Sequence, residues 1–157
     1  MMELLTSLEQ SGFATWLRES PSIWAYPTIL TLHTLGLGVL VGGSAVLDLR
    51  LLGFAPAIPL PPLERLFHAM WIGFWVNALS GAMLFTGDPT GKGTTRLFMA
   101  KLAIVAAGVL VLVALRRTVY GRRGDVAAVT TTSRALAAVS LVLWFLAIVA
   151  GRYMAYL

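Results

Sequence analysis

The sequence predicts an all-α fold, namely a four-helix transmembrane bundle preceded by a short interfacial amphipathic helix. Two observations support this prediction. First, 58% of the residues are hydrophobic and only 12% are charged, whereas the usual shares in soluble domains are nearer ~45–50% and ~25%. Second, the chain contains four apolar runs, each long enough to cross a bilayer, with proline, glycine and arginine clusters between them. The length of 157 residues then suits one membrane domain over residues 1–157.

The composition also excludes several classes of function. There are no cysteines, which removes disulfides, thiolate metal sites and Cys-x-x-Cys-His haem attachment. The net charge is +5, but the basic residues stand between apolar runs and do not form the polar surface that nucleic-acid binding requires. No catalytic triad, phosphate loop or His-Glu-x-x-His motif is present. We therefore expect no catalytic residues and a lipid bilayer, not a nucleic acid, as the surrounding partner.

The first twenty residues predict a helix that lies in the membrane interface. Met1, Leu5, Leu8 and Trp16 repeat at helical spacing, and polar residues occupy the other positions, as in amphipathic interfacial helices. A basic n-region is missing, so the segment does not read as a secretory signal. We expect this helix to cover about residues 2–18.

Four membrane spans are expected after this segment. Ser20 and Pro21 form an N-cap followed by a first-turn proline. Prolines 56, 59, 61 and 62 mark the first connection, GDPTGKG the second and RRTVYGRRGD the third. The predicted spans are about residues 22–47, 63–86, 97–115 and 134–156.

Basic residues predict the orientation of these spans. The first and third connections carry Arg50, Arg65, Arg116, Arg117, Arg122, Arg123 and Arg134. The opposite side carries Arg18, Lys92, Arg96, Lys101 and Arg152, several of them on or inside helices. The positive-inside rule places the more basic side in the cytoplasm, so both termini and the interfacial helix are expected on the periplasmic side.

His33 is the main candidate functional residue, because it is ionisable and lies inside an otherwise uncharged run. Such residues in membrane spans are functional candidates by default. At about 100° per residue, His33 shares a stripe with Tyr26 and Ser44. The structural interpretation is a histidine that hydrogen-bonds a neighbouring helix, and the functional interpretation is a metal or haem ligand.

Two further features of the same span predict packing and charge neutralisation. Gly38 and Gly42 form a small-xxx-small pair on the face opposite His33, and such pairs let a neighbouring helix approach closely. On this prediction, Gly38→Leu disrupts the bundle or its oligomer. Asp48 and Arg50, near the inner end, are expected to neutralise one another or neighbouring arginines.

Asn77 in the second span is predicted to meet His33. It lies midway between Gly73 and Gly81 on one stripe, and both polar residues lie about ten or eleven residues from the outer ends of their helices, which at ~1.5 Å per residue gives similar depth. An interhelical hydrogen bond and a ligand role both remain open for Asn77. His68 lies on the opposite side of its helix and at a depth that differs from His33 by on the order of 10 Å. This disfavours a haem held by both histidines of one protomer.

Lys101 and Arg152 complete the candidate site. Both lie near the outer ends of their spans, where long side chains reach water. The functional alternative is a positive patch above His33 and Asn77 that attracts an anion or a propionate-bearing cofactor. The predicted cofactor-binding set is therefore His33, Asn77, Lys101 and Arg152, with His33 as the metal ligand.

Four stretches carry a resemblance to a known family: SPSIWAYPTILTLHTLG, DLRLLGFAP, MWIGFWVNALSG and AGRYMAYL. They resemble an uncharacterised family of small four-span bacterial inner-membrane proteins, a domain of unknown function. The motif positions matched are His33, Asp48, Arg50, Asn77, Lys101 and Arg152. The resemblance implies a multi-pass protein of the bacterial inner membrane and supplies no established activity. A looser similarity, a histidine followed by Gly-Gly, is to copper-resistance D proteins.

Three classes of function follow. A non-enzymatic accessory or assembly subunit, in a homo-oligomer or a larger membrane complex, fits the glycine stripes and the absence of catalytic motifs. The alternatives are an electron-transfer protein that binds a b-type haem through His33, and a small copper or solute transporter. The transporter lacks an inverted repeat or a broken helix pair. The visible spectrum of the purified protein distinguishes the haem protein from the others.

Overall fold

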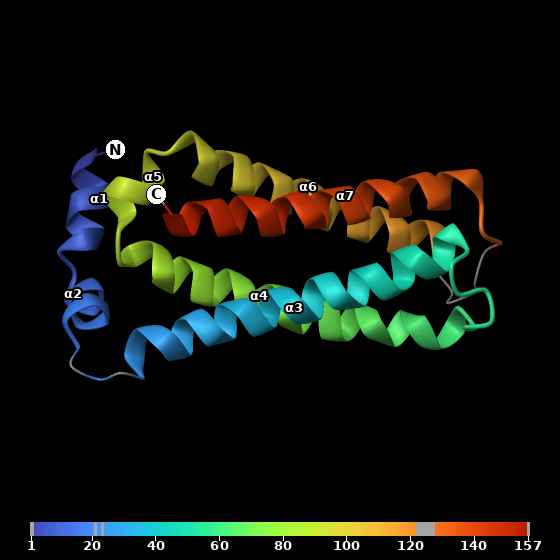
Figure 1. The fold of residues 1–157 in the computed structure, drawn as a ribbon, viewed down its shortest axis with the longest axis horizontal. Coiled ribbons are helices and arrows are strands. Elements are labelled where there is room, and N and C mark those ends of the chain that lie inside the picture. Colours follow the sequence, from blue (N-terminus) through green and yellow to red (C-terminus); the bar gives the residue numbers. More distant parts are fainter. Residues whose placement is uncertain (1, 21, 23, 122–127, 157) are drawn as a thin grey trace.

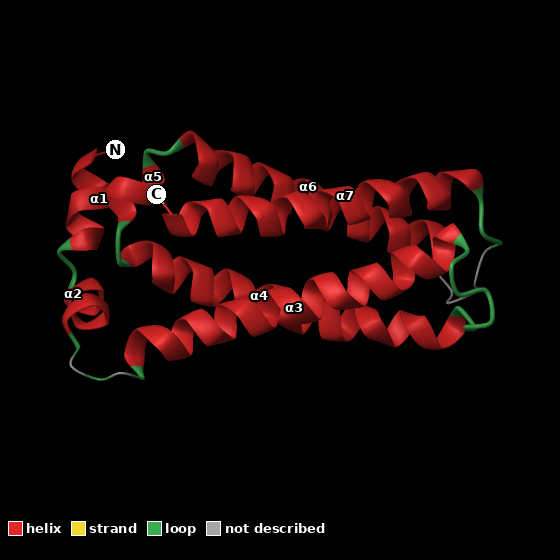
Figure 2. Ribbon diagram, in the orientation of Figure 1, coloured by secondary structure: helices red, strands yellow, loops and turns green. Residues whose placement is uncertain are grey.

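The computed structural model describes residues 2–20, 22, 24–121 and 128–156. Figures 1 and 2 show four long helices side by side, with short N-terminal helices across one end and no strand among the described residues. The elements are α1 (Met2–Glu9), α2 (Gly12–Glu19), α3 (Ala25–Leu52), η1 (Pro61–Arg65), α4 (Leu66–Thr86), α5 (Pro89–Gly93), α6 (Arg96–Val119), α7 (Thr131–Tyr153) and η2 (Met154–Tyr156).

Four segments are long and apolar enough to cross a membrane: α3, the continuous η1–α4 segment Pro61–Thr86, α6 and α7. The all-helical class and four helices long and apolar enough to span a membrane are thus confirmed among the described residues. Within the described residues, α3 contacts both α4 and α7, and α7 contacts α6 (Figure 1).

The first span differs from its prediction at both ends. It begins at Ala25, and Ser20 is the C-cap of α2; Pro21 of the predicted start signal lies outside the described residues. At the other end, α3 continues five residues beyond 47 and stops at Gly53, whose φ of 98° is the left-handed conformation that glycine adopts without strain. An apolar helix has no internal signal to stop, so the glycine sets its length.

The N-terminal segment forms two helices, where one helix over residues 2–18 was predicted. The Ser11 side chain accepts a hydrogen bond from the Ala14 backbone N–H and so starts α2 as a new helix. Arg18 then donates to the backbone oxygens of Glu9 and Gly87, at 2.9 and 3.2 Å. These bonds fold α2 back and attach the segment to the α4–α5 connection.

Capping residues also move two other boundaries. The predicted turn after the second span contains the short helix α5, because the Asp88 side chain accepts from the Gly91 backbone N–H and Pro89 occupies the first turn. Helix α7 starts three residues before Arg134, since Thr130 and Ser133 form a reciprocal capping box.

The core lies between α3 and its two neighbours. Trp144 of α7 is 2% exposed, and its indole Nε1 donates to the Ser44 hydroxyl of α3 at 3.1 Å. The same ring lies on α6, because a Cβ at Gly108 would be 3.1–3.3 Å from three of its atoms. Trp144 therefore joins three helices at one level. The other large side chains with at most 1% exposure are Tyr120, Phe67, Leu40, Leu47, Leu51, Met70, Leu112 and Leu115.

The predicted packing of Gly38 and Gly42 against another helix of the same chain is wrong for the described residues. A Cβ at either position would have no atom within 4 Å, apart from its own helix backbone and chain neighbours. Close approach occurs instead at Gly36 of α3 and Gly73 of α4, where each added Cβ would lie 2.7 Å from the carbonyl oxygen of the other. Gly38 and Gly42 follow the small-xxx-small spacing on an exposed side of α3, whereas Gly36 lies on its buried face.

The expected neutralisation of Asp48 by arginine is also wrong. Asp48 is completely buried, and neither carboxylate oxygen has a hydrogen-bond partner among the residues that the structure describes. Arg50 lies on another face of α3, where its Nε donates to the backbone oxygen of Ile58. Among the described residues the ion pair is Arg116–Glu64, at 3.7 Å. Arg122 and Arg123 of the predicted basic cluster lie outside the described residues.

Tyr120, just after α6, lies at the end of the molecule that holds Arg50 and Arg116. Its hydroxyl donates to the backbone oxygen of Leu60 at 2.9 Å, and its ring meets Phe67 edge to face at 5.7 Å. Burial, with a smaller contribution from the nearby Glu64 carboxylate, raises the pKa of Tyr120 to about 12. The connection before α4 is thereby tied to α6.

This raised pKa predicts a loss of stability at alkaline pH. The unfolded phenol has its ordinary pKa of 10.0, so the folded state holds the proton more tightly. The corresponding stabilisation is complete below pH 10 and is lost as the pH approaches 12, by on the order of 2 kcal/mol. Alkaline unfolding followed by circular dichroism should show a smaller loss over this interval in Tyr120→Phe than in the wild type. Tyr153→Phe, at an exposed tyrosine, is the control, and equal curves for wild type and Tyr120→Phe would contradict the prediction.

Candidate functional site

The predicted meeting of His33 and Asn77 is confirmed. The Asn77 side-chain Nδ2 donates to the His33 backbone oxygen at 2.7 Å. In return, His33 Nδ1 lies 2.9 Å from the Asn77 backbone oxygen and 3.2 Å from the Ser80 hydroxyl. Because a carbonyl oxygen only accepts hydrogen bonds, we assign the ring proton to Nδ1. Helices α3 and α4 are thus joined by reciprocal hydrogen bonds that pair each residue with the other's backbone.

Glycines on both helices create the space for this contact. Gly36 lies one turn after His33, and its added Cβ would lie 2.7 Å from the Asn77 backbone nitrogen. Gly81 lies one turn after Asn77, and its added Cβ would lie 2.9 Å from the His33 ring carbon Cε1. The imidazole therefore rests against the α4 backbone, where a larger side chain would displace it.

Lys101 of α6 approaches this site from the side. Its Nζ is 3.6 Å from the position of an added Cβ at Gly151 of α7, and its charge is close enough to His33 to act on the ring. The side chain is half-buried between helices. The structure therefore brings three of the four predicted site residues, His33, Asn77 and Lys101, into one region.

Arg152 is not brought to this region by any described contact. It lies on an exposed side of α7, and its guanidinium stands 5.2 Å from the ring centroid of Tyr156. The residues that share its stripe, Phe145 and Tyr156, are 66% and 73% exposed. This stripe faces outward because the buried face of α7 is defined by small residues and Trp144. The described contacts thus lack the predicted positive patch of Lys101 and Arg152 above His33.

The metal and haem predictions depend on the free nitrogen of His33. Nδ1 is used by α4, so Nε2, which lies 3.4 Å from Asn77 Nδ2, is the nitrogen left for a ligand role. His68 is exposed on another face of α4. In the part of the chain that the structure describes, no three His, Cys, Asp or Glu side chains gather as a metal site would require. The haem and metal roles of His33 stay predictions, with one available ligand atom.

The stripe of Gly73, Asn77 and Gly81 faces α3, as its spacing predicts, but the sequence interpretation missed two contributors to the His33 contact, Ser80 and Gly36. Ser80 lies three residues after Asn77, which is the spacing of side chains on one helix face, so this spacing could have revealed it. Gly36 follows His33 at the same spacing, but the more conspicuous Gly38–Gly42 pair drew the packing prediction to the wrong face.

Comparison of the chain with protein-family models, with curated proteins and with solved structures gives no match.

Proposed function

We propose that this chain is a non-enzymatic accessory or assembly subunit of the bacterial inner membrane, built as a four-helix transmembrane bundle, and that the outer face of α3 binds a transmembrane helix of another subunit. The four apolar helices support the membrane location. The resemblance to small four-span inner-membrane proteins supports the choice of membrane.

The observation that carries the proposal is the open glycine surface of α3. Gly38 and Gly42 are exposed, and each leaves free space where a side chain would stand. Exposed apolar side chains flank them, including Leu35, Val39 and Val46, at 60%, 46% and 45%. In lipid, helices associate through close packing of small residues, since lipid tails are as apolar as leucine. A second helix can therefore approach the α3 backbone here more closely than at a leucine-covered face.

The outer polar residues support the same function. His33 and Asn77 each hydrogen-bond the backbone of the other's helix. These hydrogen bonds hold α3 and α4 together. A fastened α3 is a rigid surface, and rigid surfaces lose little conformational freedom when a partner binds.

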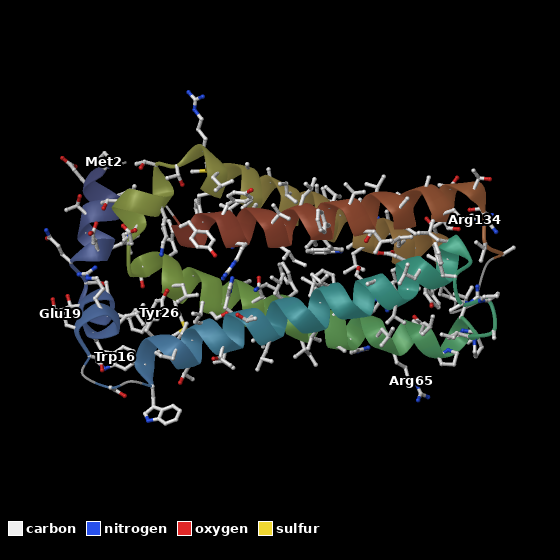
Figure 3. All side chains as sticks on the ribbon, in the orientation of Figure 1. Met2, Trp16, Glu19, Tyr26, Arg65 and Arg134 are labelled. Atoms are coloured by element: carbon white, nitrogen blue, oxygen red, sulfur yellow. The ribbon has the colours of Figure 1, made fainter. Side chains whose placement is uncertain are left out.

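The proposed topology places both termini in the periplasm. Trp16 and Tyr26 lie at the end with the termini, and Arg65 and Arg134 lie at the opposite end (Figure 3). Aromatic residues are typical of headgroup level, and arginines are typical of the cytoplasmic side. We propose that α1 and α2 lie along the periplasmic membrane surface, with their exposed Leu4 and Trp16 in the interface.

Single-cysteine cross-linking in native membranes tests the proposed surface. The chain has no cysteine, so Gly38→Cys introduces a unique thiol without a background. We expect it to cross-link to a second membrane chain, and two tags of different length will show whether that chain is another copy. Ala106→Cys, at an exposed small residue of α6, is the matched control.

Equal cross-linking from Gly38→Cys and Ala106→Cys would contradict the proposed surface. A visible spectrum of the same purified protein distinguishes the haem-binding alternative from the proposed assembly function. A Soret band that disappears in His33→Ala would support electron transfer in place of an assembly role.

A further inference from the structure

Asp48 of α3 and Ser140 of α7 form a buried pair of polar side chains without partners, here called the Asp48–Ser140 pair. Both side chains are 0% exposed. The two Asp48 carboxylate oxygens and the Ser140 hydroxyl are the buried side-chain polar atoms that lack a hydrogen-bond partner among the described residues. The hydroxyl is near enough to act on the carboxyl group. The pair lies at the α3–α7 contact, one turn from the Ser44–Trp144 hydrogen bond.

No described charged side chain neutralises Asp48. On its own helix, Arg50 donates to the Ile58 backbone oxygen. On α6, Arg116 pairs with Glu64. On α7, Arg134 is exposed at the start of the helix (Figure 3). Helix α4 contributes His68, which is also exposed. In the described part of the protein, the carboxylate therefore has no ion-pair partner and no formed hydrogen bond, and the polar group beside it is the neutral Ser140 hydroxyl.

A bare carboxylate in this position is costly, because the low-dielectric interior supplies nothing in exchange for its hydration. Ionisable residues within membrane spans are accordingly paired, or they bind protons and ions. A metal cation of the calcium or magnesium type takes about six oxygen ligands, and the pair offers one carboxyl group and one free hydroxyl, since the Ser44 hydroxyl already accepts from Trp144. A proton needs a single oxygen.

We propose that the Asp48–Ser140 pair is a proton-binding site within the membrane. The Asp48 carboxylate accepts one proton from a hydronium ion: an O–H bond of the hydronium breaks, the carboxyl O–H bond forms, and a water molecule leaves, so that the product is a neutral carboxylic acid. The new O–H is a donor, and the Ser140 hydroxyl beside it is an acceptor without a partner, so one proton removes both the charge and the unpaired groups. This site is independent of the assembly surface on the outer face of α3, and neither proposal depends on the other.

Infrared spectroscopy of the full-length protein in liposomes tests this directly, because a protonated carboxyl group has a carbonyl stretch separate from that of a carboxylate. At neutral pH we expect one protonated-carboxyl band in the wild type and its loss in Asp48→Asn. Asn is the neutral isostere of the acid, so the variant should keep the wild-type melting temperature at neutral pH. Asp88→Asn is the matched control, since Asp88 caps α5 outside the spans. This variant should show the same protonated-carboxyl band as the wild type.

Ser140→Ala provides a readout that a purely structural role would not change. Removing the acceptor should move the Asp48 band to higher wavenumber and leave its area intact. Absence of the band in the wild type at neutral pH would overturn the proposal. A melting temperature that rises with sodium chloride but not choline chloride, and only when Asp48 is present, would identify a metal cation as the occupant and equally overturn it.

Discussion

Gly36→Val is expected to separate α3 from α4 and to destabilise the protein by at least about 3 kcal/mol, the upper part of the range for overpacked cores. A Cβ at Gly36 would stand 2.7 Å from both the Gly73 carbonyl oxygen and the Asn77 backbone nitrogen. Both obstacles are backbone atoms, so no side-chain rotation relieves the clash. Helix separation would also break the hydrogen bonds between His33 and Asn77. Thermal unfolding in detergent, followed by circular dichroism, measures the effect.

Gly38→Val is the matched control for Gly36→Val, with the same substitution two residues along the same helix. It meets open space, so its melting temperature should stay within a few degrees of the wild type. On the proposed function, a larger side chain at Gly38 should instead weaken association with a partner helix. Equal destabilisation by the two valines would refute the assigned packing face.

Trp144→Ala is the second substitution with a large expected effect, a loss of about 3–5 kcal/mol as for other buried aromatic truncations. The indole contacts α6 at Gly108 and hydrogen-bonds Ser44 of α3, so its removal leaves a cavity among three helices. Trp144→Phe should cost less, because it keeps most of the packing and loses the Ser44 bond. Chemical unfolding in mixed micelles measures the free energies.

Phe145→Ala gives the comparison for Trp144→Ala, since it removes a large aromatic side chain from the next position. Phe145 is 66% exposed, and in a membrane its ring faces lipid. We expect a change within about ±0.5 kcal/mol. A loss at Phe145 as large as that at Trp144 would show that the assigned buried face of α7 is incorrect.

The sequence predicted the helical spans well and their faces poorly, for one physical reason. Span positions follow from length and hydropathy, and the common depth of His33 and Asn77 follows from the fixed rise of the helix. Which face turns inward normally follows from a contrast between apolar and polar sides. Helix α3 has no clear contrast between an apolar and a polar face, so the Gly38–Gly42 spacing pointed to one face, and only the fit of Gly36 against Gly73 shows which face is buried.

The remaining differences between prediction and structure come from local and long-range contacts, which the spacing of residues along the sequence does not reveal. Ser11 starts a second N-terminal helix, which its N-cap residue type could have indicated. Asp48 lies near a span end, where a charge normally reaches water or an arginine. Its burial results from the packing of α7 against α3, and α7 begins more than eighty residues later in the sequence. The residues around Asp48 carry no pattern that indicates this contact.

The hydrogen bonds that hold the N-terminal helices have a consequence for synthesis. Glu9 accepts from Thr90, 81 residues later, and Arg18 donates to Gly87, 69 residues later. The ribosome completes α1 and α2 before Gly87 and Thr90 are made, so the two N-terminal helices cannot dock until the α4–α5 connection has been synthesised. Docking of the N-terminal helices therefore comes after the synthesis of both α3 and α4.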